Sequence, residues 1–431
     1  MNPVRRRWLA LLAAAAGGSA LAPEFAGAAD PGNADDEDGV RRGRVLRFPR
    51  DHGAHLGAQT EWWYATGWLA RAEGAADPDP ATAQPAYGFQ STFFRSRTGL
   101  AEGLTSRFAA RQLLFAHAAV TDLAARRHRH AQSIARWSGD PTARLASASV
   151  ADCDVRLPGW SLDRTGTGAV TGAGSGTGTD TGAQAQSAYR ARLGSPGAAA
   201  DDSADTAGAP AGAAPEFAFD LRLARSQPLL LQGEAGYSRK GPDAGQASHY
   251  YSEPQLAVEG RLRLAGQRLA VGGRAWLDHE WSEQILHPEA VGWDWIGINL
   301  TDGSAGGAAS AGSALTAFRL RRADGSTLWA GGSFRAAGQP ATSFAPDAVR
   351  FRPGRVWNSP STGAHYPVEW QIDTPAGSFT LRALMDAQEL DGGASTGTVY
   401  WEGLSELLAA GGRRVGLGYL EMTGYVAPMK L

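Results

Sequence analysis

In Phe217-Ala218-Phe219-Asp220-Leu221-Arg222-Leu223, every second side chain is large and apolar, and those between are small or charged. This period of two is expected of a half-buried β-strand, because alternate side chains face opposite sides of a sheet. Other short apolar or aromatic runs, bounded by turn residues, predict strands at residues 62–69, 87–94 and 113–120. The sequence therefore predicts an all-β fold.

Composition and charge narrow the classes of fold and function. The 431 residues exceed what one hydrophobic core usually organises, so we expect two domains, and the 56 Gly, 23 Pro and 14 Trp residues suit β structure. The formal net charge is -2 and no stripe of Lys and Arg interleaves with aromatic residues, which argues against a nucleic-acid partner. Cys153 is the only cysteine, so no internal disulfide can form, and we expect a buried, inert thiol.

Residues 1–28 are predicted to be a signal peptide. The tandem arginines Arg5-Arg6-Arg7 precede an apolar run from Trp8 to Ala16, and small residues follow around Ala26-Gly27-Ala28. The apolar run is too short to remain as a membrane span. We therefore expect export by the general secretory or twin-arginine route, and a periplasmic or secreted protein with no transmembrane segment after leader removal.

The rest of the chain divides by composition. Residues 29–44 are polar and rich in turn formers, which predicts a mobile N-terminus of the mature protein. Residues 45–286 and 287–431 each contain several short predicted strands and are the two expected domains. Within the first domain, residues 165–215 consist mainly of Gly, Ala, Thr, Ser and Asp, so we expect a disordered insertion with one short strand at 188–193.

The densest group of chemically active side chains is Trp276-Leu277-Asp278-His279-Glu280-Trp281. On an extended strand, the first, third and fifth of these side chains face one side, and the other three face the opposite side. Desolvation keeps a carboxyl group among indole rings protonated, so Asp278 or Glu280 is a candidate proton donor, with His279 as catalytic support. The alternative is a turn whose acidic side chains bind backbone groups; the crowding of these residue types favours catalysis.

A second cluster, Glu61-Trp62-Trp63-Tyr64, is a candidate wall of a small-molecule site. Its aromatic rings provide apolar surface, and Glu61 or Tyr64 can make a polar contact with a ligand. Alternatively, the two tryptophans belong to the core and Glu61 anchors an arginine at the closed end of a barrel. His52 and His55 have the spacing of metal ligands on a helix, but neighbouring glycines favour a loop, so we predict no metal site.

Other aromatic and histidine residues extend the candidate site. The additional candidates for ligand contact are Trp276, Trp281, His117, Tyr250, Trp293 and Trp295. A lone strand histidine such as His117 is more often a core residue than a catalyst. Residues 400–403 and 418–425 are interpreted as closing strands of a barrel, and no phosphate-binding glycine loop occurs in the sequence.

Six aromatic-rich segments, at residues 61–67, 88–95, 276–281, 292–295, 400–403 and 418–425, together resemble a known family. They resemble the bacterial lipocalin-like proteins related to carotenoid hydratase (hydroxyneurosporene synthase; the CrtC/AttH type), in the branch of exported predicted secreted hydrolases. The resemblance runs from about Phe48 to Tyr425. It implies two tandem lipocalin-like (calycin-type) antiparallel barrels, of which the first encloses the pocket and the second packs against it.

The resemblance also implies a type of reaction. Carotenoid hydratases protonate an isolated terminal double bond and add water without a cofactor, and the acidic residue of their Asp-His motif corresponds to Asp278. Aromatic faces near such an acid can stabilise the resulting carbocation. We therefore expect no cofactor here.

Three hypotheses for function follow. The first is an enzyme that acts on an apolar or amphipathic small molecule by hydration or hydrolysis, with Asp278 as the acid and His279 and Glu280 as its support. The second is a noncatalytic periplasmic carrier of a lipid or isoprenoid, as in ordinary lipocalins. The third is a structural module of the cell envelope, which would have no enclosed pocket.

Overall fold

The fold consists of antiparallel strands. The computed structural model describes residues 39–72, 84–101, 103–104, 106, 108–140, 142–143, 145–166, 170–171, 187–196, 215–284, 286–301 and 312–429. These residues contain no α-helix and hence no helix that could cross a membrane; two short 3-10 turns, η2 (Arg50–His52) and η4 (Pro346–Ala348), are present. The predicted signal peptide and most of the predicted insertion lie outside the described residues.

The first sheet has thirteen strands in the described part of the chain. Eleven follow one another along the sheet, and two short ones pair only with β14. In spatial order the eleven are β5 (Arg127–Trp137), β4 (Gln112–Asp122), β3 (Tyr87–Arg97), β2 (Thr60–Arg71), β15 (Gln267–Ser282), β14 (Ala247–Leu264), β11 (Phe217–Ala224), β10 (Ala188–Gly194), β8 (Trp160–Thr165), β7 (Asp154–Leu157) and β6 (Ser147–Ala148). The two short strands are β12 (Leu230–Leu231) and β13 (Tyr237–Arg239).

This sheet curls into a nearly closed barrel. Strands β5 and β7, near the two ends of the series, contact each other, and β4 also contacts β7 and β10. The strands are long and their alternate side chains are apolar, so curling allows one face to form a common core. That interior contains Trp63, Phe89, Phe93, Leu221 and Leu277, all fully buried.

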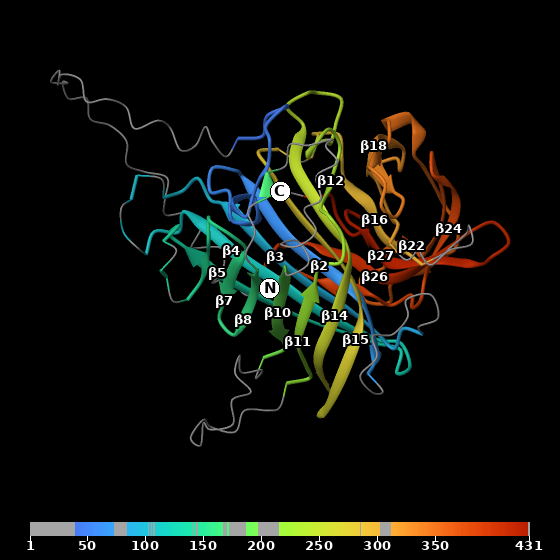
Figure 1. Cartoon of the computed structure of the whole chain (residues 1–431), viewed down its shortest axis with the longest axis horizontal. Coiled ribbons are helices and arrows are strands. Elements are labelled where there is room, and N and C mark those ends of the chain that lie inside the picture. Colours follow the sequence, from blue (N-terminus) through green and yellow to red (C-terminus); the bar gives the residue numbers. More distant parts are fainter. Residues whose placement is uncertain are drawn as a thin grey trace. The chain divides into compact units, whose positions relative to one another are not determined.

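The second sheet has ten strands in the described residues and appears in orange to red in Figure 1. Its members, in spatial order, are β19 (Thr342–Ser343), β18 (Thr327–Arg335), β17 (Ala314–Arg321), β16 (Gly292–Leu300), β27 (Arg414–Met422), β26 (Val399–Leu408), β24 (Gly377–Ala383), β23 (Glu369–Thr374) and β20 (Arg350–Pro353), with β25 (Glu389–Asp391) beside β26. Two small sheets complete the fold: β1 (Arg47–Phe48) with β9 (Val170–Thr171), and β21 (Val356–Asn358) with β22 (His365–Pro367).

The strands expected from the sequence are present. The alternating segment at 217–223 lies in β11, and the predicted strands at 62–69, 87–94, 113–120 and 188–193 lie in β2, β3, β4 and β10. The chain leaves the first sheet at Ser282 and enters the second at Gly292, while contacts group residues 35–431 into one compact unit. The division into domains at 286 and 287 therefore stays a prediction.

A hydrophobic cluster joins the two sheets. From the first sheet it includes Tyr64, Trp68 and Trp276, and from the second it includes Trp295 and Tyr419, among others. These first-sheet side chains point away from the barrel interior, because each is separated from an interior residue by one position along its strand. Residues 63–69 of β2 and 275–280 of β15 are therefore buried on both faces, one inside the barrel and one against the second sheet.

Candidate active site

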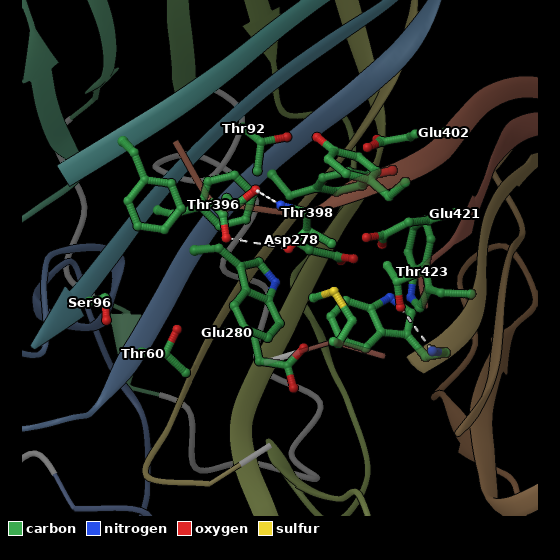
Figure 2. Close-up of a pocket in the computed structure, with 18 of the residues that line it drawn as sticks. Thr60, Thr92, Ser96, Asp278, Glu280, Thr396, Thr398, Glu402, Glu421 and Thr423 are labelled. Atoms are coloured by element: carbon green, nitrogen blue, oxygen red, sulfur yellow. Dashed lines mark hydrogen bonds between the residues drawn. The ribbon is translucent and has the colours of Figure 1, made fainter. Parts of the chain in front are cut away.

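A cavity of about 290 Å³ lies between the outer face of the first sheet and the second sheet. Figure 2 shows many of its side chains, with several carboxyl groups directed toward the same space. The walls are mainly apolar and include several aromatic rings, and the polar groups are four carboxyl groups, one lysine, one glutamine and several hydroxyls. The main side chains are Trp62, Tyr64, Phe94, Phe115, Lys240, Tyr250, Asp278, Glu280, Trp293, Trp295, Phe318, Tyr400, Glu402 and Glu421.

The strand register brings these side chains together. Asp278 on β15 lies directly opposite Ser252 on β14 and Tyr64 on β2. Two residues along, Glu280 is paired with Tyr250 on β14 and Trp62 on β2. Because paired residues in adjacent strands point to the same face, both rows face the second sheet.

Asp278 is a buried carboxyl group with its oxygens held by three donors. Its side chain accepts hydrogen bonds from the Tyr250 hydroxyl at 2.8 Å, from the Trp276 indole N–H at 2.7 Å and from the Ser252 hydroxyl. The residue is 3% exposed. Burial raises the pKa of Asp278 to about 7, against the opposing effect of these hydrogen bonds. Near neutral pH the group can therefore give up a proton inside an aromatic cavity.

Glu280 differs from Asp278 because it has a cationic partner. The Lys240 ammonium lies 2.9 Å from Glu280 Oε1, and Ser248 also donates a hydrogen bond to that oxygen. The same ammonium lies over the rings of Tyr250 and Phe318, at 4.6 Å and 4.4 Å from the ring centroids. Glu280 is thus part of a buried ion pair, and of the two predicted acids Asp278 is the better proton donor.

Two further carboxyl groups enter the cavity from the second sheet. Glu402 on β26 and Glu421 on β27 are directly paired across these strands. Burial raises the pKa of Glu421 to about 7 and that of Glu402 well above its ordinary value. Gln90 donates a hydrogen bond of 2.6 Å to Glu402 Oε2, whereas Oε1 has no hydrogen-bond partner.

Glu402 and Glu421 are absent from the predicted site residues, because residues 400–403 and 418–425 are interpreted there as architectural strands. They are indeed strands, β26 and β27, but one face of each contributes to the cavity. A signal was present in the sequence. Glu402 and Glu421 each lie inside an aromatic, strand-forming segment. Burying an unpaired carboxyl group there costs free energy, so its presence indicates a functional role.

The opposite faces of the same strands build a polar network inside the barrel. Glu61 accepts hydrogen bonds from Arg95 Nε at 2.7 Å, and its other oxygen lies 2.8 Å from His55 Nδ1 and 2.9 Å from His279 Nε2. Burial opposes ionisation of Glu61, but Arg95 and the two imidazoles hold its pKa well below the ordinary value. Trp281 stacks on His55 with ring centroids 3.6 Å apart.

This network gives the alternative interpretation of Glu61 a structural basis, since the carboxylate anchors an arginine. His55, Glu61 and His279 also present ligand atoms within 4.8 Å of one another, a spacing at which a metal ion could be held. The carboxylate is already neutralised by Arg95 and hydrogen-bonded by both imidazoles, so the arrangement is complete as a network of hydrogen bonds.

The predicted site residues therefore separate into two groups. Those that line the cavity are Trp62, Tyr64, Tyr250, Asp278, Glu280, Trp293 and Trp295. Those on the inner face of the barrel are Glu61, Trp63, His279 and Trp281, which the period of two turns away from the cavity. His279 therefore faces away from this cavity, and its role as catalytic support stays a prediction.

The two remaining candidates stand next to the cavity. Trp276 donates its hydrogen bond to Asp278 and packs in the cluster between the sheets. His117 lies 2.6 Å from the Tyr400 hydroxyl and 2.7 Å from the Ser395 hydroxyl through its two ring nitrogens. Both therefore position residues of the cavity wall.

The place of the cavity differs from the expectation drawn from the resemblance. A pocket enclosed by the first barrel was expected, whereas this cavity uses the outer face of that barrel and needs the second sheet for its other wall. The physical reason is that the interior is filled by large side chains, including fully buried Trp63, Phe89 and Phe93.

Comparisons with known proteins agree with this architecture. A family model described as AttH-like matches residues 39–425. A candidate AttH from Nitrosomonas europaea, known from a crystal structure, is 40% identical, with a TM-score of 0.69, and the alignment covers 90% of this chain and 99% of that one. Kievitone hydratase from Nectria haematococca has the same fold, with a TM-score of 0.57 at 13% identity, covering 89% of this chain and 94% of that one. A search of the curated proteins finds no match.

Proposed function

Because this chain belongs to the AttH-like family, we propose that it is an exported, cofactor-free enzyme that adds water to an apolar or amphipathic small molecule. The observation that carries the proposal is the environment of Asp278. Its carboxyl group is buried, its pKa lies near 7, and it faces a cavity walled by Trp62, Trp293 and Trp295. A buried carboxyl group whose pKa lies near neutrality carries its proton in part of the molecules at neutral pH and is suited to general acid catalysis.

Hydration of a carbon–carbon double bond fits these groups. In this reaction the Asp278 carboxyl transfers its proton to one alkene carbon, and the positive charge develops on the other carbon. The faces of the surrounding aromatic rings stabilise that charge, and a water oxygen then bonds to the cationic carbon. The proton lost by the water passes to the Asp278 carboxylate, which restores the acid and balances the reaction.

Hydrolysis is the less favoured form of the reaction. An ester or amide substrate develops an oxyanion, which needs hydrogen-bond donors or a cation that is free to approach it. Among the described residues that line the cavity, Lys240 is the only lysine or arginine, and Glu280 already binds it. The fold shared with kievitone hydratase, a hydratase by name, is in line with hydration.

The finer features of the proposal concern architecture and location. We propose that each large sheet is a lipocalin-like barrel, that residues 1–28 are a signal peptide, and that the mature protein is periplasmic or secreted.

The second candidate function is a carrier of a lipid or isoprenoid, which the same aromatic cavity would also suit. A purely structural module of the cell envelope is expected to have no enclosed pocket, so the cavity argues against that function.

The proposal is tested with isotopically labelled water. Purified protein is incubated with a panel of isoprenoid alkenes, comprising kievitone, other prenylated phenols and an acyclic carotenoid, in water enriched in oxygen-18. We expect a product that is heavier by one labelled water molecule, and we expect D278N to form it at a rate at least about a hundredfold lower. The surface variant D347N is the matched control, because Asp347 is an exposed residue of η4.

Two results would decide against this function. If folded D278N, with an unchanged near-ultraviolet circular dichroism spectrum, kept the full rate of a substrate that the wild type hydrates, Asp278 would not be the acid. If the panel were bound and released chemically unchanged after long incubation, the carrier function would replace the enzymatic one.

A further inference from the structure

One end of the cavity already holds an ammonium group that belongs to the protein. The Lys240 ammonium is bound by the Glu280 carboxylate and lies between the ring faces of Tyr250 and Phe318. Lys240 and Glu280 are 6% and 4% exposed. A carboxylate with aromatic faces is the combination of groups that binds ammonium ions in proteins generally.

The other end has the same two kinds of group without a cation. Glu402 and Glu421 are paired across β26 and β27, and Figure 2 shows them together and apart from Glu280. Tyr64, Trp295 and other aromatic residues of the cavity wall surround them. No lysine or arginine other than Lys240 occurs among the described residues that line the cavity.

Two buried polar atoms at this end lack a hydrogen bond of normal geometry. Glu402 is 2% exposed, and its Oε1 has no hydrogen-bond partner although Oε2 is bound by Gln90. The hydroxyl of Tyr64, which is 6% exposed, lies beside the Glu402 carboxyl group, but the contact between them does not reach normal hydrogen-bond geometry. Both residues line the cavity, so these atoms are available to a ligand. Buried polar atoms are normally satisfied, and an exception that faces a cavity is one place where a ligand can supply the missing partner.

The arrangement is costly for the empty protein. Two adjacent buried carboxyl groups cannot both be ionised at low energetic cost, so they hold protons that exposed glutamates would have lost. A cation placed beside them allows one carboxyl group to ionise and replaces the missing solvation. The cost of burying the acids is thereby offset when the ligand is present.

We propose that the Glu402–Glu421 end of the cavity is a binding site for a compact, positively charged organic group such as a quaternary ammonium. Its positive charge contacts the carboxylates, and its methyl groups contact the aromatic faces. Hydration of an alkene is not required for this site, which would serve a cationic ligand equally in an enzyme or a carrier. A tertiary carbocation has a similar shape and charge, so the site would also favour the intermediate of the reaction proposed above.

The test compares two small molecules of nearly the same shape. Choline carries a quaternary nitrogen where 3,3-dimethylbutan-1-ol carries a neutral carbon, so the pair differs essentially in charge. Binding to the full chain is followed by isothermal titration calorimetry and by tryptophan fluorescence, since Trp62, Trp293 and Trp295 line the cavity. We expect choline to bind roughly tenfold more tightly or better than the neutral alcohol at about pH 8.

Variants locate the site. E402Q keeps the shape of the side chain but cannot ionise, and we expect it to weaken choline binding roughly tenfold with little effect on the neutral alcohol. D347N, on the surface, should leave both affinities unchanged. Retained binding of the alcohol by E402Q shows that the cavity remains folded. A loss of affinity confined to choline then shows that the negative charge of Glu402 attracts the cation.

The choline affinity should also depend on pH. Protons on the acids compete with the cation, and because the pKa of Glu421 is about 7, the affinity should rise between about pH 6 and about pH 8, with release of a proton on binding. The neutral alcohol should show no such dependence. The charged and titratable groups of the cavity and of the strands packed around this pair are Tyr64, Lys240, Asp278, Glu280, Tyr400, Glu402, Tyr419 and Glu421.

The proposal is overturned if neither molecule binds, if the alcohol binds as tightly as choline, or if E402Q weakens both equally. These outcomes are independent of the oxygen-18 assay. A failure of cation binding with intact hydration would reject only the cation site, and cation binding without hydration would reject only the enzymatic function.

Discussion

Replacing Asp278 by Asn should change how the stability of the protein depends on pH. The pKa of this carboxyl is about 7 in the folded chain and 3.8 in an exposed reference state. Between these values the folded protein binds the proton and the unfolded chain does not. Stability therefore falls as pH rises toward 7, and the contribution of Asp278 is complete only below the unfolded pKa.

The magnitude follows from the range of pH that is measured. At about pH 5 the carboxyl group of the unfolded chain has already lost its proton, whereas the folded group keeps it up to about pH 7. The two states therefore differ by one proton over about two pH units, and each unit corresponds to about 1.4 kcal/mol. Wild type should therefore lose about 3 kcal/mol more than D278N over this range. Asn at 278 also changes the hydrogen bonds with Tyr250, Ser252 and Trp276, but that effect is independent of pH and cancels in the difference.

The assay is equilibrium unfolding in urea at four pH values, followed by tryptophan fluorescence, for wild type, D278N and the exposed-site control D347N. Wild type and D347N should show the same pH dependence, and D278N a shallower one. Parallel curves for wild type and D278N would refute the assignment of a buried, protonated carboxyl group at this position, and with it the acid in the proposed reaction.

Three further predictions concern the groups around the site. K240M should lower the free energy of unfolding by about 3–5 kcal/mol, because it leaves a charged Glu280 buried without its partner, and the double variant K240M/E280Q should recover most of that loss in urea titrations. E61Q should destabilise the protein by about 3 kcal/mol and yet leave choline affinity unchanged, since Glu61 faces the barrel interior; an equal effect on binding would contradict the separation of the two faces. G273A should lower the thermal midpoint strongly, because a Cβ there would overlap the backbone of β2, whereas G103A, where no atom lies nearby, should be close to neutral.

The fold class and the strand faces were largely predictable, and the location of the cavity was not. Alternation of apolar side chains identifies a strand and divides its residues into two faces, as the segment 276–281 shows. A period of two does not tell which face becomes a barrel interior and which contacts a second sheet when both are apolar. Here Trp62 and Trp63 are equally aromatic neighbours, yet only Trp62 lines the cavity.

The two acids of the second sheet could not be assigned to the cavity from the sequence either. Glu402 and Glu421 lie well over a hundred residues after Asp278 in the sequence, and only the contact between the sheets brings them to one cavity. No local pattern records such a contact. An acidic residue inside an aromatic strand indicates a side chain whose burial costs free energy. Only the tertiary structure shows that the side chain faces a cavity.

The inner network and the cavity are linked by strand register, although their side chains do not meet. Pairing of β2 with β15 places Trp63 opposite His279 on the inner face and Tyr64 opposite Asp278 on the outer face. The hydrogen bond from His279 to Glu61, together with the Arg95 ion pair, favours this register from inside the barrel. A slip of one residue would turn Tyr64 into the barrel and bring an interior residue beside Asp278. The buried ions inside the barrel therefore help to fix which side chains share the cavity with Asp278.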